Sequence, residues 1–437
     1  MGKVGILEKF FKLSEHNTTI KTEVIAGITT FMTIAYILIV NPIILEDAGM
    51  NYGAVFTATA LSAAVGTIVM AFAANLPFVL APGMGLNAFF AYVVVRGMGY
   101  PWEFALTAVF LEGLIFLGLT FLNVREAIIN FIPMSVKYGI STGIGLFIAF
   151  IGLKNGGIIV ADPDTFLTLG NVKSGGALLA LIGILITGAL LARGFRGALL
   201  IGIMLTTIIG IPLGVTDLAS FNTEWLFRPP SLAPTMFKLD FSNIFSKDMF
   251  LVLSTFLFVD MFDTVGTLIG VSTKSGMLTE DGQVPNAKQA LFADAIGTTF
   301  GALAGTSTVT TCVESAAGVA EGGRTGLTAL TAGLLFALSL FLAPIFLLVP
   351  SAATAPALVL VGLFMLSPIK DINFEDYTEA IPAFLTIIMM PFGFSIAHGI
   401  VFGVLSFVII KLITGRGKEV NLVTYAIAAL LLGSFFI

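Results

Sequence analysis

The chain is poor in charge, cysteine and histidine. Only 11% of its 437 residues are charged, whereas a soluble domain has about 25%. A single cysteine excludes an internal disulfide, and no cysteine–histidine cluster has the spacing of a metal site. The net charge is −5 and there is no basic tract, which argues against a nucleic-acid partner. We therefore expect a protein outside the soluble class that needs no metal or other cofactor.

What the chain has instead is apolar sequence, with 57% hydrophobic residues and a mean hydropathy of +1.03. Apolar runs long enough to cross a hydrocarbon layer of about 30 Å recur from Val24 to the C-terminus. Lipid offers backbone groups no hydrogen-bond partner, so the spans are helices or a closed barrel. The runs are continuous rather than alternating, which favours helices. The predicted fold class is an all-α polytopic membrane protein.

Fourteen spans are predicted, seven in each half of the chain, joined by the long polar segment 214–248. In the first half they are 23–45, 53–74, 76–95, 103–122, 135–153, 176–192 and 197–213. In the second half they are 249–271, 289–305, 309–320, 326–348, 356–366, 380–394 and 397–413. An apolar tail, 422–437, follows, and whether it crosses the membrane is left open.

The lysines and arginines predict how the chain is oriented. With the N-terminus in the cytoplasm, fifteen of them fall in cytoplasmic segments and six in outer segments. An excess of these residues on the cytoplasmic side is the usual arrangement in membrane proteins. Because each half has an odd number of spans, the two halves are then inverted relative to each other in the membrane.

The third span of each half is irregular. In "LPFVLAPGMGLNAFFAY", Pro82 and its neighbouring glycines predict extended backbone, followed by a helix that restarts near Met84. In the second half, the threonine-rich "TSTVTT" predicts a short strand, and a helix restarts near Cys312 or Val313. Interrupted segments at matching positions of two halves are the best sequence indication of a transporter's binding site. The free first-turn N–H groups make Met84 and Gly85 candidate substrate contacts.

A glutamate, Glu314, follows the second break. An ionised carboxylate within lipid costs about 3 kcal/mol even on a gentle scale, and the positive end of a helix dipole offsets part of that cost. Such a group can accept hydrogen bonds from a ligand, carry a proton, or do both. The alternative is that Glu314 only caps its own half-helix. Aligning "LNAFFAY" with "VESAAGV" makes Asn87 its counterpart in the first half.

A second acidic cluster lies in the eighth span, "FLFVDMFDTVGTLIGV". Asp260 and Asp263 are three residues apart and share one helical face. Like charges this close leave at most one of them ionised. Asp263 is the candidate for ligand or proton binding, whereas Asp260 could equally brace the neighbouring backbone. Asp294 and Thr310 are assigned supporting roles as well, and the role of Glu112, inside the fourth span, is left open.

Three motifs carry a family resemblance, namely "PGMGLNAFFAY", "FVDMFDTVGTLIGV" and "GTSTVTTCVESAAGVAEGGRTGLTAL". The chain resembles, essentially end to end, the AzgA-like adenine, guanine and hypoxanthine permeases of the xanthine/uracil permease superfamily. The resemblance implies a proton-coupled importer of purine bases in the cell membrane, and not an enzyme. It assigns substrate binding to Asn87, Asp263, Glu314 and the adjacent Ser315. One departure, Cys312, stands where much of the family is aromatic and bears on substrate preference.

The resemblance also implies two inverted seven-helix repeats, sorted into a core and a gate domain that move like an elevator. Substrate lies between the third, eighth and tenth spans, and Glu314 and Asp263 are the candidates for proton coupling, with sodium as the alternative ion. Relatives of this fold are often dimers, so a homodimer is an assembly to test. The implied divisions are a cytoplasmic arm, 1–22, core segments 23–122 and 249–348, and gate segments 123–248 and 349–437.

The residues themselves leave other interpretations open. Carboxylates and an amide match the donors and acceptors of adenine, guanine or hypoxanthine, but equally those of uracil or xanthine. An anion carrier of the same fold is disfavoured, because carboxylates would repel its ligand. An intramembrane aspartyl enzyme fits poorly, since Asp263 and Glu314 would have to form its acidic pair. Several phenylalanines lie near the polar groups and one could stack on a flat ligand: Phe89, Phe90, Phe258 and Phe262.

Overall fold

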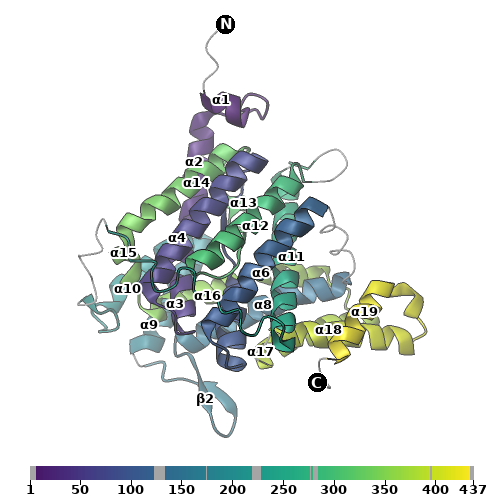
Figure 1. Ribbon diagram of the computed structural model, residues 1–437. Coiled ribbons are helices and arrows are strands. Elements are labelled where there is room, and N and C mark those ends of the chain that lie inside the picture. The colour runs from purple at the N-terminus through teal and green to yellow at the C-terminus, as the bar shows by residue number, and fades with distance from the viewer. Residues whose placement is uncertain are drawn as a thin grey trace.

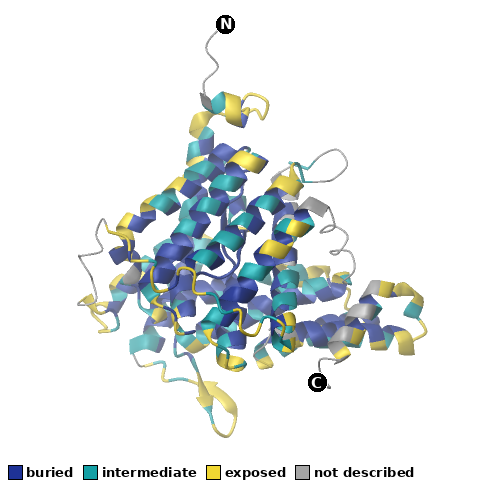
Figure 2. Cartoon of the chain, viewed as in Figure 1, coloured by how far each residue is buried: buried dark blue, intermediate teal, exposed yellow. Residues whose placement is uncertain are grey.

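The computed structural model describes residues 6–122, 133–173, 175–218, 228–275, 277–278, 284–393 and 396–433. Most of these residues form helices that pack side by side, and the short helix α1 stands at the top of the view in Figure 1. Figure 2 shows that buried residues line the centre of the helix bundle, while exposed residues gather on α1, on the hairpin that contains β2, and towards the C-terminal end.

The helices of the first half run in the order α1 (Ile6–Phe11), α2 (Ile20–Ile34), α3 (Ile37–Glu46), α4 (Tyr52–Val69), the π-helix η1 (Met70–Ala74), α5 (Met84–Ala88), the π-helix η2 (Phe89–Gly97), α6 (Trp102–Leu122), α8 (Met134–Asn155), α9 (Gly175–Ala192) and α10 (Ala198–Gly210). The second half contains α11 (Lys247–Ser275), α12 (Ala287–Ala304), α13 (Ser315–Ala320), α14 (Gly326–Ser339), η5 (Leu340–Leu342), α15 (Ala343–Leu347), α16 (Ser351–Met365), η6 (Ser367–Asp371), α17 (Tyr377–Phe392), α18 (Ile396–Ile413), η7 (Gly417–Glu419) and α19 (Leu422–Gly433).

Side-chain caps start several of these helices. Thr19, before α2, accepts the backbone N–H of Thr22, and Asn51, before α4, accepts that of Ala54. Thr325 caps α14 in the same way. Such side chains satisfy N–H groups that have no partner within the first turn. These three helices therefore begin where the sequence supplies a short polar side chain.

Several helical stretches are long and apolar enough to cross a membrane: Ile20–Glu46, Tyr52–Ala74, Trp102–Thr120, Met134–Asn155, Gly175–Ala192, Lys247–Leu268, Gly326–Phe346 and Ser351–Asp371. Shorter apolar helices also fall on predicted spans: Met84–Gly97, Ala198–Gly210, Tyr377–Phe392 and His398–Ile413. The polytopic helical class is confirmed, and the number of fourteen spans stays a prediction. Residue 394, which ends one predicted span, and residues 434–437 of the tail lie outside the described residues.

The first and the twelfth predicted spans differ from the helices in the structure. The first span is not one continuous helix, because Ala35 and Tyr36 interrupt it between α2 and α3. The helix predicted to start at Pro356 begins five residues earlier, at Ser351. Pro356 lies inside α16, where it cannot donate the backbone hydrogen bond of an ordinary helical residue.

The helix contacts fall into two groups. α2, α4, α6, α12 and α14 pack mainly on one another, and so do α8, α9, α10, α16, α17 and α18. Glycines permit the closest approaches, since Gly66 of α4 faces Gly297 of α12, and Gly145 of α8 faces Gly362 of α16. Small residues at helix contacts are typical of proteins in lipid, where no hydrophobic effect drives helices together.

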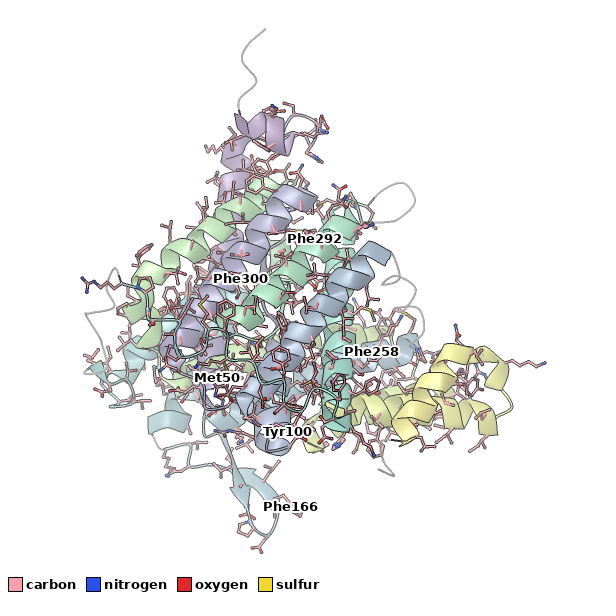
Figure 3. The ribbon with its side chains drawn as sticks, viewed as in Figure 1. Met50, Tyr100, Phe166, Phe258, Phe292 and Phe300 are labelled. Atoms are coloured by element: carbon pink, nitrogen blue, oxygen red, sulfur yellow. The ribbon has the colours of Figure 1, made fainter. Side chains whose placement is uncertain are left out.

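The strands form two small antiparallel pairs. β1 (Leu80–Pro82) pairs with β4 (Val309–Thr311), with Ala81 opposite Thr310. β2 (Ile159–Asp162) and β3 (Phe166–Leu169) form a hairpin that extends from the helices, and Phe166 lies near its end (Figure 3). The two pairs differ in burial, because every residue of β1 and β4 is buried whereas every residue of β3 is exposed.

Candidate functional site

The pairing of β1 with β4 brings the two breaks in the helices together. Two backbone bonds extend the ladder beyond the strands: Gly83 N donates to Thr308 O at 3.0 Å, and Cys312 N donates to Val79 O at 2.9 Å. Extended backbone at depth in a membrane protein is tolerated where protein surrounds it, and here each break supplies hydrogen-bond partners for the other. The extended segments predicted at both breaks are confirmed.

A helix restarts after each strand. α5 begins at Met84, as predicted. α13 begins at Ser315, two or three residues later than predicted. The delay arises because residues 312–314 first form a turn, whose three carbonyls accept the first three amides of α13 at 3.0–3.1 Å. Glu314 therefore stands immediately before α13 and not inside it.

Glu314 occupies the N-cap position of α13, but its side chain makes no capping hydrogen bond. Its Oε1 instead accepts a hydrogen bond from Tyr36 Oη at 2.7 Å. Tyr36 is buried and lies in the interruption between α2 and α3, whereas Glu314 is half-buried. The alternative in which Glu314 only caps its own half-helix is thus not supported. Tyr36 is a site residue that the sequence analysis missed, and its one sequence signal is a hydroxyl within an apolar span.

Asp263, on α11, lies beside the first break. A Cβ atom placed on Gly83 would lie 3.7 Å from Asp263 Oδ2. Asp263 is also within electrostatic range of Glu314 and Asp294, so three carboxylates surround the paired strands. Like Glu314, Asp263 is half-buried. The structure therefore brings together the two acids that the sequence singled out, from segments about fifty residues apart.

The neighbouring hydroxyl of Thr264 connects the supporting residues. Its Oγ1 lies 2.9 Å from Asp294 Oδ1, 2.6 Å from Thr310 Oγ1 and 3.3 Å from Asp260 Oδ1. Asp294 Oδ1 also accepts the backbone N–H of Thr311 at 3.1 Å. These contacts join α11, α12 and β4 at one buried point, which is a bracing geometry. The supporting roles of Asp260, Asp294 and Thr310 remain predictions.

Asn87 is the fourth residue of α5 and is fully buried. Its Oδ1 accepts a hydrogen bond from Ser307 Oγ, and its Nδ2 lies 4.0 Å from Met84 Sδ. Ser307 was not predicted as a site residue, and neither was Thr308, whose Oγ1 donates to Glu112 Oε2 at 2.6 Å. The run of hydroxyls in the sequence was the available signal for both. Substrate contact by Asn87 and Met84 stays a prediction.

The remaining predicted contacts have backbone and packing neighbours. Ser315 Oγ donates to Cys312 O at 2.7 Å and accepts from Val79 N at 3.0 Å, so it ties the second break to the first. Gly85 faces α8, where a Cβ atom added to it would lie 2.6 Å from Ile144 Cγ2. The contact of Ser315 and Gly85 with substrate also stays a prediction.

Aromatic rings lie near this polar group. Phe89 packs edge to face on Phe256, with ring centroids 5.0 Å apart. Phe90 is fully buried, and Phe258, on α11, is half-buried (Figure 3). The side chain of Phe262 lies outside the described residues. Phe258 lies on the helix that carries Asp263 and packs against the apolar cluster of Phe116 and Met261.

Comparison with known sequences decides the family. A model of the xanthine/uracil permeases, described as a permease family, matches residues 21–402. The chain belongs to this family. The permease is 46% identical over 417 residues to the adenine permease AdeP of Escherichia coli K12, which covers 95% of this chain and 93% of that protein. It is 44% identical over 432 residues to the guanine/hypoxanthine permease PbuG of Bacillus subtilis 168, which covers 96% and 97%.

The permease also has a solved structural neighbour. It resembles the transmembrane domain of the cyanobacterial bicarbonate transporter BicA with a TM-score of 0.64 and 16% identity, covering 88% of this chain and 97% of that one. A similarity at this identity shows the fold alone. With the family and the apolar helices, the chain is a multi-pass membrane transporter and not an enzyme. The resemblance to purine permeases is confirmed, and the intramembrane enzyme is excluded.

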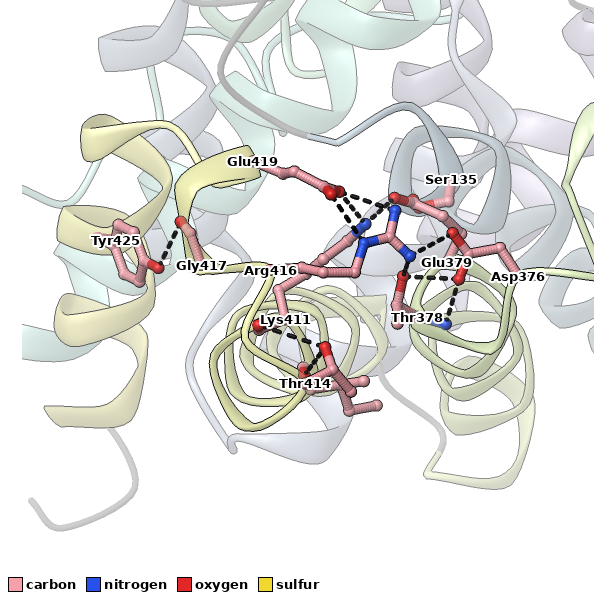
Figure 4. Close-up of polar contacts among 11 residues, drawn as sticks. Ser135, Asp376, Thr378, Glu379, Lys411, Thr414, Arg416, Gly417, Glu419 and Tyr425 are labelled. Carbon is pink, nitrogen blue, oxygen red and sulfur yellow. Dashed lines mark hydrogen bonds and ion pairs between the residues drawn. The ribbon is translucent and has the colours of Figure 1, made fainter.

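Away from this site, the permease has a charged cluster between α17, α18 and η7 (Figure 4). Lys411 is buried and its Nζ lies 2.8 Å from Glu379 Oε1 and 2.7 Å from Glu419 Oε2. Arg416 forms ion pairs with Asp376 at 2.7 Å and Glu419 at 2.8 Å. Hydrogen bonds from Arg416 lower the pKa of Asp376 and of Glu419 to about 2. The cluster connects the start of α17 to the segment that leads into α19.

Proposed function

We propose that this permease imports purine nucleobases, among them adenine, guanine and hypoxanthine, across the cell membrane by secondary active transport. The observation that carries the proposal is that Asn87 and Glu314 follow the two paired strands and that Asp263 lies beside the first break. One relative is named an adenine permease and another a guanine/hypoxanthine permease, at nearly equal identity. The purine class is therefore better supported than any single purine.

The chemistry of the site matches such a ligand. Purine bases are flat, mostly neutral, and carry N–H donors beside ring acceptors. Carboxylates such as Glu314 and Asp263 accept N–H groups, and the amide of Asn87 can donate or accept. One of the phenylalanines near the polar groups could supply an aromatic face on which the ring stacks.

Coupling to a proton gradient follows from the same acids. A carboxyl group that is ionised on one side of the membrane and protonated on the other carries one proton per cycle. Glu314 and Asp263 lie within electrostatic range of each other, and repulsion between two carboxylates favours the state in which one of them holds a proton. We assign the proton to this pair. Sodium is the alternative coupling ion, and a gradient experiment separates the two.

We further infer two inverted seven-helix repeats. Contacts between equivalent elements support this arrangement: Gly66 with Gly297 joins the second spans of the two halves, and Gly145 with Gly362 joins the fifth spans. β1 and β4, from the third spans, also pair with each other. Equivalent elements touch in this way around a two-fold axis that lies in the membrane plane.

The two groups of packed helices support a core and a gate that move like an elevator. Gly85 of α5 lies against Ile144 of α8, a helix of the second group, so such a movement would act on this contact beside the site. The N-terminus lies in the cytoplasm, and a homodimer is the assembly to test. The proposed divisions are the arm 1–22, the core 23–122 and 249–348, and the gate 123–248 and 349–437.

Anion transport is the alternative that the fold similarity raises, because BicA is a bicarbonate transporter. The carboxylates of Glu314, Asp263 and Asp294 surround the paired strands, and Glu314 and Asp294 accept hydrogen bonds there from a tyrosine hydroxyl, a threonine hydroxyl and a backbone N–H. An anion would be repelled by such a site. A neutral base that donates N–H groups would be attracted to it.

The test is uptake of labelled adenine, guanine, hypoxanthine and uracil into proteoliposomes, with and without an inward proton gradient. We expect the gradient to drive accumulation of at least one purine. Equilibration without accumulation would remove proton coupling, and a sodium gradient would then be applied. Uptake of uracil in preference to every purine, or uptake of bicarbonate with no base transported, would overturn the proposed substrate class.

A further inference from the structure

Three consecutive hydroxyl side chains, Thr306, Ser307 and Thr308, lead into β4 and are all fully buried. Each contacts a different helix of the first half. Thr306 Oγ1 accepts from Asn41 Nδ2 on α3 at 2.8 Å. Ser307 Oγ donates to Asn87 Oδ1 on α5, and Thr308 Oγ1 donates to an acid on α6. Only the middle hydroxyl reaches a residue of the proposed binding site.

The contact with Ser307 gives the two ends of the Asn87 amide different hydrogen-bond partners. An asparagine side chain has one carbonyl acceptor and one NH₂ donor. Ser307 occupies the carbonyl. Among the residues that the structure describes, the partner found for Nδ2 is Met84 Sδ at 4.0 Å, and a thioether is a weak acceptor. The donor end of the amide is therefore the end that can still form a strong hydrogen bond.

We infer that Ser307 is a positioning residue for substrate specificity, which holds the Asn87 amide so that its N–H, and not its carbonyl, faces the bound base. This inference rests on the proposed function. Its chemical consequence is that Asn87 recognises a hydrogen-bond acceptor on the ligand, such as a ring nitrogen that carries no hydrogen. Adenine, guanine and hypoxanthine all have such nitrogens, whereas neutral uracil has none.

The hydrogen-bonding capacity of the neighbouring acids supports this assignment. An ionised carboxylate only accepts hydrogen bonds, so the ionised member of the Glu314–Asp263 pair recognises an N–H group of a base and leaves its ring nitrogens without a partner. A site built to pair with a polar group rejects analogues that lack the group, because its own buried polar atom is then left unpaired. Asn87, with Ser307 behind it, supplies the missing donor.

The experiment compares binding of adenine with that of 1-deazaadenine, 3-deazaadenine and 7-deazaadenine, in each of which one ring nitrogen is replaced by C–H. Purified permease in lipid nanodiscs is titrated in competition with labelled adenine. In the wild type we expect one analogue to bind about tenfold more weakly than adenine. We call the ratio between the affinity for adenine and the affinity for this analogue the gap. In Ser307→Ala the Asn87 amide is free to turn, so the gap falls to about threefold or less. In Ser307→Thr, which keeps the hydroxyl, the gap is retained.

Two further variants separate positioning from general damage. Thr306→Val removes the adjacent buried hydroxyl, which contacts Asn41 and not Asn87, and the gap is expected to persist even if overall affinity falls. Asn87→Asp keeps the size of the side chain but removes the donor, so the gap is lost. If Ser307→Ala does not fold, as judged by thermal unfolding in detergent, Ser307→Cys takes its place. Its weak S–H donor is expected to narrow the gap.

The outcomes distinguish this inference from the proposed function. An unchanged gap in a folded Ser307→Ala or Ser307→Cys protein overturns the inference, and so does a gap lost equally in Thr306→Val. If Asn87→Asp also retains the gap, Asn87 is not the contact, and the inference fails together with that assignment. If folded wild-type protein binds no purine at all, the proposed function itself fails.

Discussion

A hydrogen bond of 2.7 Å joins Tyr36 Oη to Glu314 Oε1, across 278 residues of sequence. Neither residue lies within a regular helix, since Tyr36 interrupts the first span and Glu314 precedes α13. The donor and the acceptor meet because two irregular segments, one from each half, lie against each other. The acid at the centre of the proposed site is therefore held from the opposite half of the chain.

Tyr36→Phe tests this hydrogen bond, because phenylalanine keeps the ring and removes only the hydroxyl. A hydrogen bond to a charged group contributes about 1.5–3 kcal/mol, so we expect the apparent affinity for adenine to fall about tenfold or more. The measurement is the initial rate of uptake into proteoliposomes at a series of adenine concentrations. Tyr138→Phe on α8 is the matched control and is expected to behave as wild type. Equal kinetics for the two variants would show that the bond to Glu314 is dispensable.

Glu314→Gln keeps the side-chain volume but cannot be ionised. We expect it to abolish accumulation driven by a proton gradient, because the proposed proton carrier is lost. The control is Glu321→Gln, which neutralises an acid at the other end of the same half-helix, where it forms an ion pair with Arg196. Accumulation is measured as the ratio of inside to outside label at steady state. A wild-type ratio in Glu314→Gln would remove this residue from proton coupling.

Substitutions of the two aspartates of α11 are expected to have different effects on uptake and on stability. Asp263 is half-buried beside Gly83, whereas Asp260 is fully buried and lies near the bracing hydroxyl of Thr264. Asp263→Asn should therefore reduce uptake by at least tenfold, and Asp260→Asn should mainly lower thermal stability. Uptake and unfolding temperature are measured on the same preparations. The opposite order of effects would mean that Asp260 is the ligand-binding acid.

Substitution of Gly85 tests the contact between α5 and α8 beside the site. A methyl group at this position would lie 2.6 Å from Ile144 Cγ2, which is closer than real Cβ atoms approach. Gly85→Ala is expected to slow uptake several-fold, because α5 can no longer pass closely against α8. Ile144→Ala, which removes the opposing atoms, should restore part of the rate in the double variant. Additive losses, without any rescue, would contradict a steric origin.

The charged cluster around Arg416 predicts a dependence of stability on pH. The pKa values of Asp376 and Glu419 are lowered to about 2, from ordinary values near 4. Groups of this kind stabilise the folded state above their unfolded pKa and lose that contribution as pH falls through the folded value. We therefore expect unfolding temperature to drop between about pH 4 and pH 2. Arg416→Gln should weaken this drop, and an identical pH profile for the variant would show that Arg416 has no part in it.

The sequence was sufficient for the elements but not for their partners. Proline, glycine and threonine patterns located both breaks, because these residues act on their own backbone. The pairing of β1 with β4 could not be deduced from one sequence, because the residues of a three-residue strand do not specify which other strand it pairs with. Tyr36 and Ser307 were missed for a related reason. A single hydroxyl in an apolar or polar run becomes significant only when its distant acceptor is known.

The start of α13 was misplaced by a more local effect. Val313 and Cys312 were expected to begin the helix, but residues 312–314 form a turn that first accepts the helix's leading amides. This turn is what leaves the carboxylate of Glu314 free of a capping role and able to reach Tyr36. Sequence periodicity does not locate the end of a helix to within one or two residues, because the exact boundary depends on local hydrogen bonding.

The strand pair also constrains the order in which the protein can be built. Val79 and Ser315, which are bonded to each other, are 236 residues apart, and at about 5–20 residues per second the ribosome needs roughly ten to fifty seconds to make the intervening chain. During that interval β1 is already in the membrane while β4 has not been synthesised. Thr67 can hold β1 during this interval, because its hydroxyl forms hydrogen bonds with both the backbone N and the backbone O of Leu80. A nascent first half is therefore expected to hold its break nearly in place, and to be a target for membrane quality control until the second half arrives.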